Sequence, residues 1–446
     1  MKKRIAILGA GESGIGAAIL AQQKGFDVWV SDKGKIKEKY KSVLCKYDIK
    51  WEEEKHSLAE ILSAVEVIKS PGIPDKAEII NAINGKGISI ISEIEFAGRY
   101  TNAKKICITG SNGKTTTTSL LGDILKREGL KVCVAGNIGN SFAWEVASGN
   151  EYDFYVLEIS SFQLDGMFDF KADIAIITNI TPDHIDRYDY KFENYVNSKM
   201  RITRNMTETE SLIYCYDDLV LREQVEKLNL KCQLYPFSIK QELLKGAYLN
   251  NDIIIIQTKE KEELMSIESL ALQGKHNVYN SMAAGIGARL FEVRKTTTKE
   301  SFSDYQGIEH RLENVLNVHG IEFINDSKAT NVNSTWYALE CMKKPVVLII
   351  GGVDKGNDYE FLKQVVTQKV KGIVCLGNEN TSIIKAFSDL GIPIVETQSM
   401  RKAVNTAYVM ARNEDVVLLS PACASFDLFE NYEDRGRQFK AAVREL

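Results

Sequence analysis

The chain has 446 residues, of which 44% are hydrophobic and 26% are charged, so it is long enough to bury more than one hydrophobic core. Lysine and arginine number 56 against 60 aspartates and glutamates, and the formal net charge of −4 excludes a general basic surface for nucleic acid. No apolar run approaches the roughly 20 residues of a membrane-spanning helix, and the eight cysteines form no C-x-x-C pair, so we expect a cytoplasmic protein with reduced thiols.

Short runs rich in valine and isoleucine alternate with longer amphipathic stretches along almost the whole chain. This alternation is typical of β-α-β units and parallel sheets. We predict an α/β protein with three Rossmann-like, parallel-sheet domains over residues 1–96, 97–304 and 305–446, the central one a P-loop-type ATPase domain. Ligands of such sheets bind at the carboxyl ends of the strands, so polar residues at those positions are the first candidates for chemistry.

The first domain opens with RIAILGAGESGIGAAILAQQKGFDVWVSD, which predicts a strand, a glycine turn, a helix and a second strand. Gly9, Gly11 and Gly14 form the pattern G-x-G-x-x-G, and Asp32 ends the second strand, where a ribose-binding acid is expected. The pattern ordinarily suggests NAD, and the alternative is that the glycines only allow a tight turn. The pattern alone does not decide the ligand.

The second domain carries ITGSNGKTTTTSLL between a predicted strand and a predicted helix. A P-loop, G-x-x-x-x-G-K-[ST], would need glycine at position 108, but Ile108 stands there and Gly110 lies only three residues before Gly113. Lys114 and Thr115 still follow the last glycine directly, so backbone N–H groups, helix dipole and ammonium converge on one anion. We predict a nucleotide-binding loop in which Thr115 can bind magnesium.

Polar residues also end later strands of this domain. Glu158 ends FYVLE, where a carboxylate can reach a nucleotide-bound magnesium ion, and His184 follows a strand in NITPDHIDRYDY. Each has an ordinary alternative: a solvated strand end for Glu158 and a packing or surface residue for His184. Lys199 has one too, as a solvated lysine on a helix.

The third domain also has polar clusters at the ends of its predicted strands, in NDSKATN, GGVDKGND and SPACASFDLFENY. Lys328 and Lys355 lie in the first two clusters and suit a small substrate with several carboxylates, because ammonium groups are point-charge anchors for anions. Ordinary solvated loops are the alternative.

Several motifs follow one another along the chain: TGSNGKTTT, LEISSFQL, ITPDHIDRY with the downstream Lys199, GKHNVYNSMAA, EHRLE, INDSKATN and LLSPACASFDLF. Together they resemble the Mur ligases of peptidoglycan synthesis over essentially the whole chain, and the shortened loop is this family's form of the phosphate cradle. NDSKATN and SPACASFD favour the member that adds D-glutamate to UDP-N-acetylmuramoyl-L-alanine. The D-N-P-[RK] type motif of the ligase that adds diaminopimelate or lysine is not found.

The resemblance implies an ATP-dependent, ADP-forming ligase that makes an amide bond through an acyl phosphate. It implies two magnesium ions, one held by Thr115 and Glu158 and the other by His184 and a carbamylated Lys199. The catalytic residues it implies are Lys114, Glu158, His184 and Lys199.

The resemblance also implies three sets of binding residues. For ATP they are Gly110, Ser111, Asn112, Gly113, Lys114, Thr115, Thr116, Asn277, Asn280, Arg311 and Asp326. For the UDP-linked substrate they are Gly11, Glu12, Ser13, Gly14, Asp32, Lys33, Ser70, Pro71, Gly72, Asn137 and His184. For D-glutamate they are Lys328, Thr330, Lys355, Ser425 and Tyr432. Tyr432 stands where the family often has phenylalanine, and Lys33 where relatives frequently place a hydroxyl residue.

The partners implied are these small molecules, with no nucleic acid and no membrane, and the protein is expected to be a monomer. Three alternatives remain open. They are another Mur-type ligase with a different amino acid, an NAD-dependent oxidoreductase that uses GAGESG, and a non-catalytic nucleotide-binding regulator.

Overall fold

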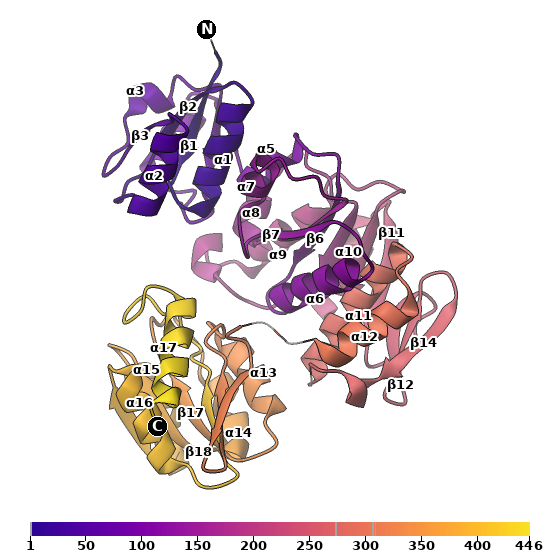
Figure 1. Ribbon diagram of the computed structural model, residues 1–446, viewed down its shortest axis with the longest axis vertical. Coiled ribbons are helices and arrows are strands. Elements are labelled where there is room, and N and C mark those ends of the chain that lie inside the picture. The colour runs from indigo at the N-terminus through magenta and orange to yellow at the C-terminus, as the bar shows by residue number, and fades with distance from the viewer. Residues whose placement is uncertain (1, 273, 306, 308) are drawn as a thin grey trace. The chain divides into compact units, whose positions relative to one another are not determined.

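A computed structural model describes residues 2–272, 274–305, 307 and 309–446 (Figure 1). Within these residues the chain divides into two compact units. The first unit runs to Leu270 and resumes at Asn277–Tyr305, and the second comprises Ala271–His276 and the chain from 306 to Leu446. The predicted α/β class with three mainly parallel sheets is confirmed, and the first two sheets share one unit. The domain boundaries at 96/97 and 304/305 stay predictions.

The first sheet of the first unit is entirely parallel, in the order β3-β2-β1-β4-β5. Its strands are β1 (Arg4–Leu8), β2 (Asp27–Ser31), β3 (Lys50–Glu52), β4 (Glu66–Lys69) and β5 (Ser89–Ile91). Its helices are α1 (Glu12–Gln23), α2 (Glu38–Lys46), α3 (Leu58–Ile61), α4 (Glu78–Gly85) and α5 (Glu93–Gly98).

The second sheet of this unit has the order β14-β13-β12-β11-β10-β9-β6-β8-β7, and its pairings are parallel except for the two that involve β13. Its strands are β6 (Lys104–Thr109), β7 (Val132–Gly136), β8 (Phe154–Glu158), β9 (Ile174–Ile177), β10 (Ser211–Cys215), β11 (Gln233–Ser238), β12 (Gly246–Asn250), β13 (Ile253–Gln257) and β14 (Lys261–Ser266). The helices are α6 (Lys114–Arg127), α7 (Phe142–Ala147), α8 (Ser161–Asp165), η1 (Ile185–Tyr188), α9 (Phe192–Met200), η2 (Arg201–Thr203), α10 (Leu219–Leu228), η3 (Ile267–Ser269), α11 (Lys275–Leu290) and α12 (Lys295–Asp304).

The sheet of the second unit has the order β15-β16-β20-β17-β18-β19, and only β15 pairs in the antiparallel sense. Its strands are β15 (Glu313–Val318), β16 (Ile321–Asn325), β17 (Val346–Ile350), β18 (Val370–Leu376), β19 (Ile394–Thr397) and β20 (Val416–Leu419). The helices are α13 (Val332–Cys341), α14 (Glu360–Lys369), α15 (Thr381–Phe387), η4 (Ser388–Leu390), α16 (Met400–Met410) and α17 (Tyr432–Arg444).

Strand β17 shows why a continuous apolar run is a strand here. Leu348 and Ile350 lie in the core against α13 and α14, and Val347 and Ile349 lie in a separate core against α16 and α17. Alternate side chains point to opposite faces of a sheet, and helices cover both faces of this one (Figure 1). A strand buried on both faces therefore needs apolar residues at every position.

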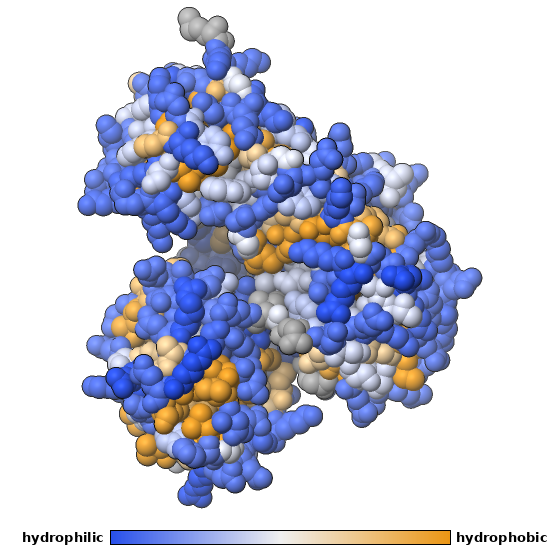
Figure 2. Space-filling model, in the orientation of Figure 1, coloured by the Kyte–Doolittle hydropathy of each residue, from blue (hydrophilic) through white to orange (hydrophobic). Residues whose placement is uncertain are grey.

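Hydrophilic residues cover most of the face seen in Figure 2. In the described part of the chain, every helix is too short or too polar to span a membrane. All eight cysteines lie in that part and carry free thiols, and most of them are buried in the cores.

Candidate active site

The loop between β6 and α6 has a conformation that requires glycine at both of its ends. Gly110 has φ 145° and Gly113 has φ 84°, in the region that L-residues rarely adopt. A Cβ on Gly110 would overlap Thr178 Oγ1, and one on Gly113 would overlap Asn280 Oδ1. The shortened motif is therefore a tight turn that puts α6 directly after its second glycine.

Residues after β9 hold this loop in place. The backbone N–H of Asn112 donates to Asn179 Oδ1 (2.9 Å), and Asn179 Nδ2 donates back to the carbonyl of Asn112 (3.0 Å). The Ser111 hydroxyl donates to the carbonyl of Thr181 (2.7 Å). The loop is thus held in shape by the chain's own hydrogen bonds.

Lys114 places a positive charge over this loop. Its ammonium donates to the carbonyls of Gly110 (2.8 Å) and Ser111 (2.9 Å). Thr115 and Thr116 follow in the first turn of α6, which contains no acidic residue and has no side-chain cap. An ammonium and uncapped N–H groups at a helix N-terminus favour an anion such as a phosphate.

Glu158, at the end of β8, is buried, and only one of its two carboxylate oxygens has a hydrogen-bond partner within the described residues. Its Oε1 accepts a hydrogen bond from Asn137 Nδ2 (2.7 Å), while within the described residues its Oε2 has no hydrogen-bond partner. A buried carboxylate oxygen without a partner is unfavourable unless a cation completes its surroundings. Glu158 is therefore suited to bind magnesium, and Asn137 lies beside its carboxylate.

Lys199, on α9, is 1% exposed. Burial, followed by the nearby charge of Lys114, holds the pKa of its amine well below the usual range. The Nζ atom lies 3.4 Å from Thr109 Oγ1 and 4.7 Å from the centre of the Tyr195 ring. A neutral lysine amine is a nucleophile, which is the state that reaction with carbon dioxide requires.

His184 directly precedes η1 and has a left-handed backbone, with φ 52°. Its Nε2 lies 3.8 Å from a carboxylate oxygen of Asp183, and its ring packs edge-on against Phe162 with centroids 5.2 Å apart. Among the described residues, no group of three or more His, Cys, Asp or Glu could hold a metal ion. A metal site here therefore depends on other oxygen ligands, such as Thr115, phosphate or a modified Lys199.

The predicted ATP residues divide between the two units. In the first unit, Asn280 Nδ2 donates to Asn277 Oδ1 (3.1 Å), and both buried amides lie on α11. In the second unit, Asp326 accepts from the Ser420 hydroxyl (2.9 Å) and from the backbone N–H of Leu312 (3.2 Å). Burial, partly opposed by the charge of Arg311, raises the pKa of Asp326 to about 6.

Asp32 stabilises the GAGESG turn through hydrogen bonds to the backbone. Its Oδ2 accepts from the backbone N–H of Ala10 (2.7 Å) and its Oδ1 from that of Gly34 (2.8 Å). A Cβ on Gly14 would overlap the carbonyl oxygen of Gly9. Asp32 therefore fixes the turn, and its role as a ligand of the UDP substrate stays a prediction.

The other residues predicted for the UDP substrate lie around this turn and the end of β4. Glu12 accepts from the Tyr40 hydroxyl (3.0 Å), and the Ser70 hydroxyl donates to the carbonyl of Gly9 (3.3 Å). Five other residues of this set are partly or fully accessible to solvent: Gly11, Ser13, Lys33, Pro71 and Gly72.

Sequence reasoning missed Arg187, which follows His184 in the motif ITPDHIDRY. Its guanidinium donates to the carbonyls of Pro71 (3.5 Å) and Ile73 (3.3 Å) and lies 4.5 Å from the centre of the Phe162 ring. It ties the segment of His184 to the predicted UDP-substrate loop. Its place inside the motif was the only signal in the sequence.

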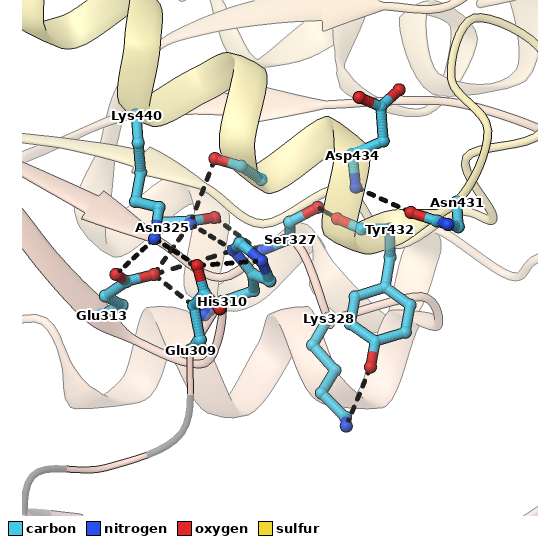
Figure 3. Close-up of polar contacts among 11 residues, drawn as sticks. Glu309, His310, Glu313, Asn325, Ser327, Lys328, Asn431, Tyr432, Asp434 and Lys440 are labelled. Carbon is cyan, nitrogen blue, oxygen red and sulfur yellow. Dashed lines mark hydrogen bonds and ion pairs between the residues drawn. The ribbon is translucent and has the colours of Figure 1, made fainter. Parts of the chain in front are cut away.

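In the second unit, Lys328 and Tyr432 point toward each other (Figure 3). The Lys328 ammonium donates to the Tyr432 hydroxyl (3.2 Å), so the tyrosine at this position adds a hydrogen bond that phenylalanine cannot make. Thr330 is half-buried, Ser425 is buried and Lys355 is exposed. Lys328 and Thr330 follow β16, Lys355 follows β17, and Ser425 and Tyr432, the first residue of α17, follow β20, so all five lie at the carboxyl end of one sheet.

Arg435 is a second residue that sequence reasoning missed. It is fully buried, and its guanidinium donates to the hydroxyl and carbonyl of Ser327 (3.0 and 2.8 Å) and to the carbonyl of Cys423 (3.1 Å). Burial lowers the pKa of Arg435 to about 10, so it remains charged at neutral pH. It joins the loop of Lys328 to the segment that leads to Ser425.

A polar cluster supports the same loop from the side of α17 (Figure 3). Lys440 pairs with Glu309 (2.6 Å) and Glu313 (2.9 Å), and Glu313 accepts from Asn325 Nδ2 (3.0 Å). The carbonyl of His310, a residue with φ 67°, accepts from the backbone N–H of Lys328 (3.0 Å). Contacts to His310 and its neighbours thereby fix the backbone beside Lys328.

Family models match three segments of the chain. They are the MurD N-terminal domain over residues 4–79, the Mur ligase middle domain over residues 108–288 and the Mur ligase glutamate ligase domain over residues 310–423.

Full-length relatives carry one common name, UDP-N-acetylmuramoylalanine–D-glutamate ligase. The chain is 55% identical to the protein of Christiangramia forsetii and 54% identical to that of Bacteroides fragilis, with 100% of both chains covered. It is 50% identical to the protein of Porphyromonas gingivalis, covering 100% of this chain and 99% of the relative.

Solved structures share the fold. The UDP-N-acetylmuramate-alanine ligase MurC of Thermotoga maritima superposes with a TM-score of 0.64 at 18% identity, covering 100% of both chains. A pseudomurein peptide ligase type C of Methanothermus fervidus gives 0.62 at 19% identity, covering 99% of each.

Proposed function

The chain belongs to the Mur ligase family, and we propose that within it the protein joins D-glutamate to UDP-N-acetylmuramoyl-L-alanine with conversion of ATP to ADP and phosphate. The observation that carries this function is identity of 50–55% over the full length to relatives named for that reaction. The same relatives argue against an oxidoreductase and against a ligase for another amino acid.

The chemistry begins with a carboxylate, which is a poor electrophile. Transfer of the γ-phosphoryl group of ATP to the carboxylate of the alanyl substrate forms an acyl phosphate and ADP. The amine of D-glutamate then attacks the acyl carbon, and phosphate leaves as the amide forms. Lys114 and the N–H groups at the start of α6 hold the phosphates and stabilise the negative charge that moves between them.

Magnesium, when bound, neutralises phosphate charge and orients its oxygens. Thr115 and Glu158 would hold one ion, and this is supported by the buried Glu158 oxygen that lacks a partner within the described residues. His184 and Lys199 would hold a second ion if Lys199 carries a carbamate.

The lowered pKa of the Lys199 amine supports a carbamate on this side chain. A neutral Lys199 amine attacks the carbon of carbon dioxide, a C–N bond forms as one C=O π bond opens, and one proton is released, which leaves an anionic carbamate in place of the neutral amine. The lowered pKa of the amine and the nearby Lys114 ammonium both favour this product.

The other substrates are assigned by the family's motifs. The GAGESG turn, the loop from Ser70 to Gly72 and Asn137 would hold the UDP-linked substrate, and Arg311 and Asp326 of the second unit are further residues predicted to bind ATP. Lys328, Thr330, Lys355, Ser425 and Tyr432 would bind D-glutamate, with the two ammonium groups facing its carboxylates. The protein would act as a monomer in the cytoplasm, where ATP and nucleotide-linked precursors are found.

The test is phosphate release from ATP and magnesium with UDP-N-acetylmuramoyl-L-alanine, assayed separately with D-glutamate, L-glutamate, L-alanine and L-lysine. Release with D-glutamate alone, together with a product of the mass of the dipeptide conjugate, is the expected result. Release with another amino acid would keep the ligase and change its substrate. No release with any amino acid would contradict the ligase.

A further inference from the structure

Lys355 lies in a turn of the second unit that its neighbours hold closed. Asp354 Oδ1 accepts hydrogen bonds from the backbone N–H groups of Gly356 (2.9 Å) and Asn357 (2.8 Å), two and three residues further along the chain, as in an aspartate turn. Lys355 itself is exposed. The lysine therefore projects from a short turn whose shape depends on Asp354 and Asn357.

The segment between β17 and the turn pairs with the segment that leads to Ser425. Val353 donates its backbone N–H to the carbonyl of Ala424 (2.8 Å), and the two residues form a β-bridge. Gly352 has φ 133°, and a Cβ there would overlap the carbonyl oxygen of Ala424. The two loops approach too closely for a side chain at Gly352.

The side chain of Asn357 forms the second connection between the two loops. Its Nδ2 donates to the carbonyl of Ala422 (3.2 Å) and to the hydroxyl of Tyr359 (3.2 Å). The Tyr359 hydroxyl in turn lies 3.1 Å from Cys423 Sγ. A chain of polar contacts thus runs from the turn of Lys355, through Tyr359, to the residues just before Ser425.

Two members of this network, Tyr359 and Cys423, are buried. Tyr359 is 3% exposed, and its ring packs edge-on against Phe387. Burial raises the pKa of the Tyr359 hydroxyl, and it raises that of the Cys423 thiol to about 11. Both groups keep their protons, so the hydroxyl can accept from Asn357 and donate to the sulfur.

We propose that Asn357 and Tyr359 are positioning residues for the amino-acid substrate, because they fix Lys355 relative to Ser425. The inference rests on the proposed function, which makes these two residues part of one site for D-glutamate. Neither Asn357 nor Tyr359 has to touch the substrate. Loss of either side chain is expected to loosen one loop against the other and weaken binding of the amino acid alone.

The experiment measures KM for each of the three substrates, with the other two saturating, in Asn357→Ala and Tyr359→Phe. The expected result is a rise of about tenfold in KM for D-glutamate for Asn357→Ala and about threefold for Tyr359→Phe, from the usual effect of one or two lost hydrogen bonds. KM for ATP and for the UDP-linked substrate is expected to stay at the wild-type value. Tyr359→Phe keeps the buried ring, so it remains informative if Asn357→Ala is unstable.

Two matched controls come from the same unit. Asn317→Ala removes an exposed asparagine that accepts from the backbone N–H of Gly320 (3.0 Å), and Tyr408→Phe removes a hydroxyl that lies 2.7 Å from His319 Nδ1. Neither side chain contacts the turn of Lys355, and both controls are expected to leave all three KM values unchanged.

The outcomes separate this inference from the function on which it rests. A wild-type protein that releases no phosphate with D-glutamate contradicts the proposed function and the inference with it. Normal wild-type turnover with an unchanged KM for D-glutamate in both variants contradicts only the positioning role. An equal rise in all three KM values also contradicts it, because that result indicates a general loss of structure.

Discussion

The first unit contains two glycine turns that each precede a helix but differ in backbone and in charge. Gly11, before α1, is extended (φ −83°), whereas Gly113, before α6, is left-handed (φ 84°). Both α1 and α6 begin directly after a glycine and lack a side-chain cap. At the first turn, Glu12 opens the helix and Asp32 accepts from Ala10. At the second turn, Lys114 opens the helix and no acidic residue follows in the first turn.

The difference shows that glycine spacing determines the conformation of such a turn, whereas the neighbouring side chains determine which ligand it favours. Carboxylates beside the first turn oppose a highly charged anion, so we expect it to hold its ligand mainly by hydrogen bonds. The ammonium of Lys114 makes the second turn the stronger phosphate site.

A third helix N-terminus in the unit is occupied by the protein itself. Glu93 accepts from the backbone N–H of Ala143 (2.9 Å), and Ser141 caps α7 by accepting from the N–H of Trp144 (3.3 Å). A helix start whose N–H groups are already satisfied has a structural role. The three helix N-termini therefore differ in the groups that lie beside their backbone N–H groups. A substitution at each of them tests this difference.

The largest effect is expected at Lys114. Lys114→Ala removes the only side-chain charge described at the start of α6, and we expect kcat/KM for ATP to fall about ten-thousandfold, as for other cations that stabilise a transferring phosphoryl group. The measurement is ATP-dependent phosphate release, with thermal unfolding to confirm that the variant folds.

The chain offers a matched control for this variant. Lys295 opens α12 with the same letters, K-T-T-T, but follows Arg294 and not a glycine turn. Lys295→Ala is expected to keep wild-type activity. Equal losses in the two variants would show that the glycine turn does not distinguish Lys114.

The next effect is expected at Lys199. Lys199→Ala removes the amine that forms the proposed carbamate, and we expect kcat to fall about a thousandfold through lost electrostatic stabilisation. Because burial lowers the pKa of this amine, it stays neutral and able to react at a lower pH than an ordinary lysine. A carbamate signal from ¹³C-labelled bicarbonate, present in the wild type and absent in the variant, is the direct measurement.

Lys191→Ala provides the comparison on the same segment, since Lys191 precedes α9 and is exposed. This variant is expected to keep both the carbamate signal and the activity. A Lys199→Ala enzyme with wild-type kcat would contradict the role of the carbamate.

The two occurrences of K-T-T-T also show what the sequence could predict. The threonine run after Lys114 is not informative by itself, because α12 begins with the same run and has no glycine turn. The strand before the loop and the glycines at 110 and 113 were the informative features, because they describe a backbone that few other sequences adopt. The parallel sheets could also be predicted, because the alternation of short apolar runs and amphipathic stretches is a local pattern that can be recognised in the sequence.

Long-range partners could not be predicted in this way. Arg187 and Arg435 hold backbone carbonyls of segments far away in the chain, and nothing in their local sequence identifies those carbonyls. Asp32 was expected to contact a ligand, and only the fold shows that both of its oxygens accept from backbone N–H groups. Such roles depend on tertiary contacts, which periodicity and motif spacing do not encode.

The third test concerns Glu93, which fills the start of α7. Burial raises its pKa to about 7 from an ordinary 4.5. The folded state therefore keeps this proton between pH 4.5 and 7 while the unfolded chain loses it, so the free energy of unfolding falls as pH rises through that interval. The shift corresponds to about 3 kcal/mol. Glu93→Gln cannot titrate and is expected to lack this fall, measured as the difference in unfolding between pH 5 and pH 8.

Glu95→Gln is the matched control, because Glu95 is also buried on α5 and accepts from the backbone N–H groups of Phe168 and Phe170 (2.9 Å each). Glu93 is intact in this control, so the fall in stability between pH 5 and pH 8 should remain. An unaltered pH dependence in Glu93→Gln would show that the carboxylate is ionised in the folded protein.

The smallest effect is expected at the first glycine turn. Asp32→Asn keeps one oxygen but loses a charged acceptor, so either Ala10 or Gly34 loses its partner. We expect KM for the UDP-linked substrate to rise about tenfold, the usual effect of losing one hydrogen bond to a charged group. KM for ATP should not change, because the second turn has its own cation.

Asp27→Asn, at the other end of β2 and paired with Arg4, is the control. A rise in KM for ATP as large as that for the UDP substrate would mean that the two turns do not act separately.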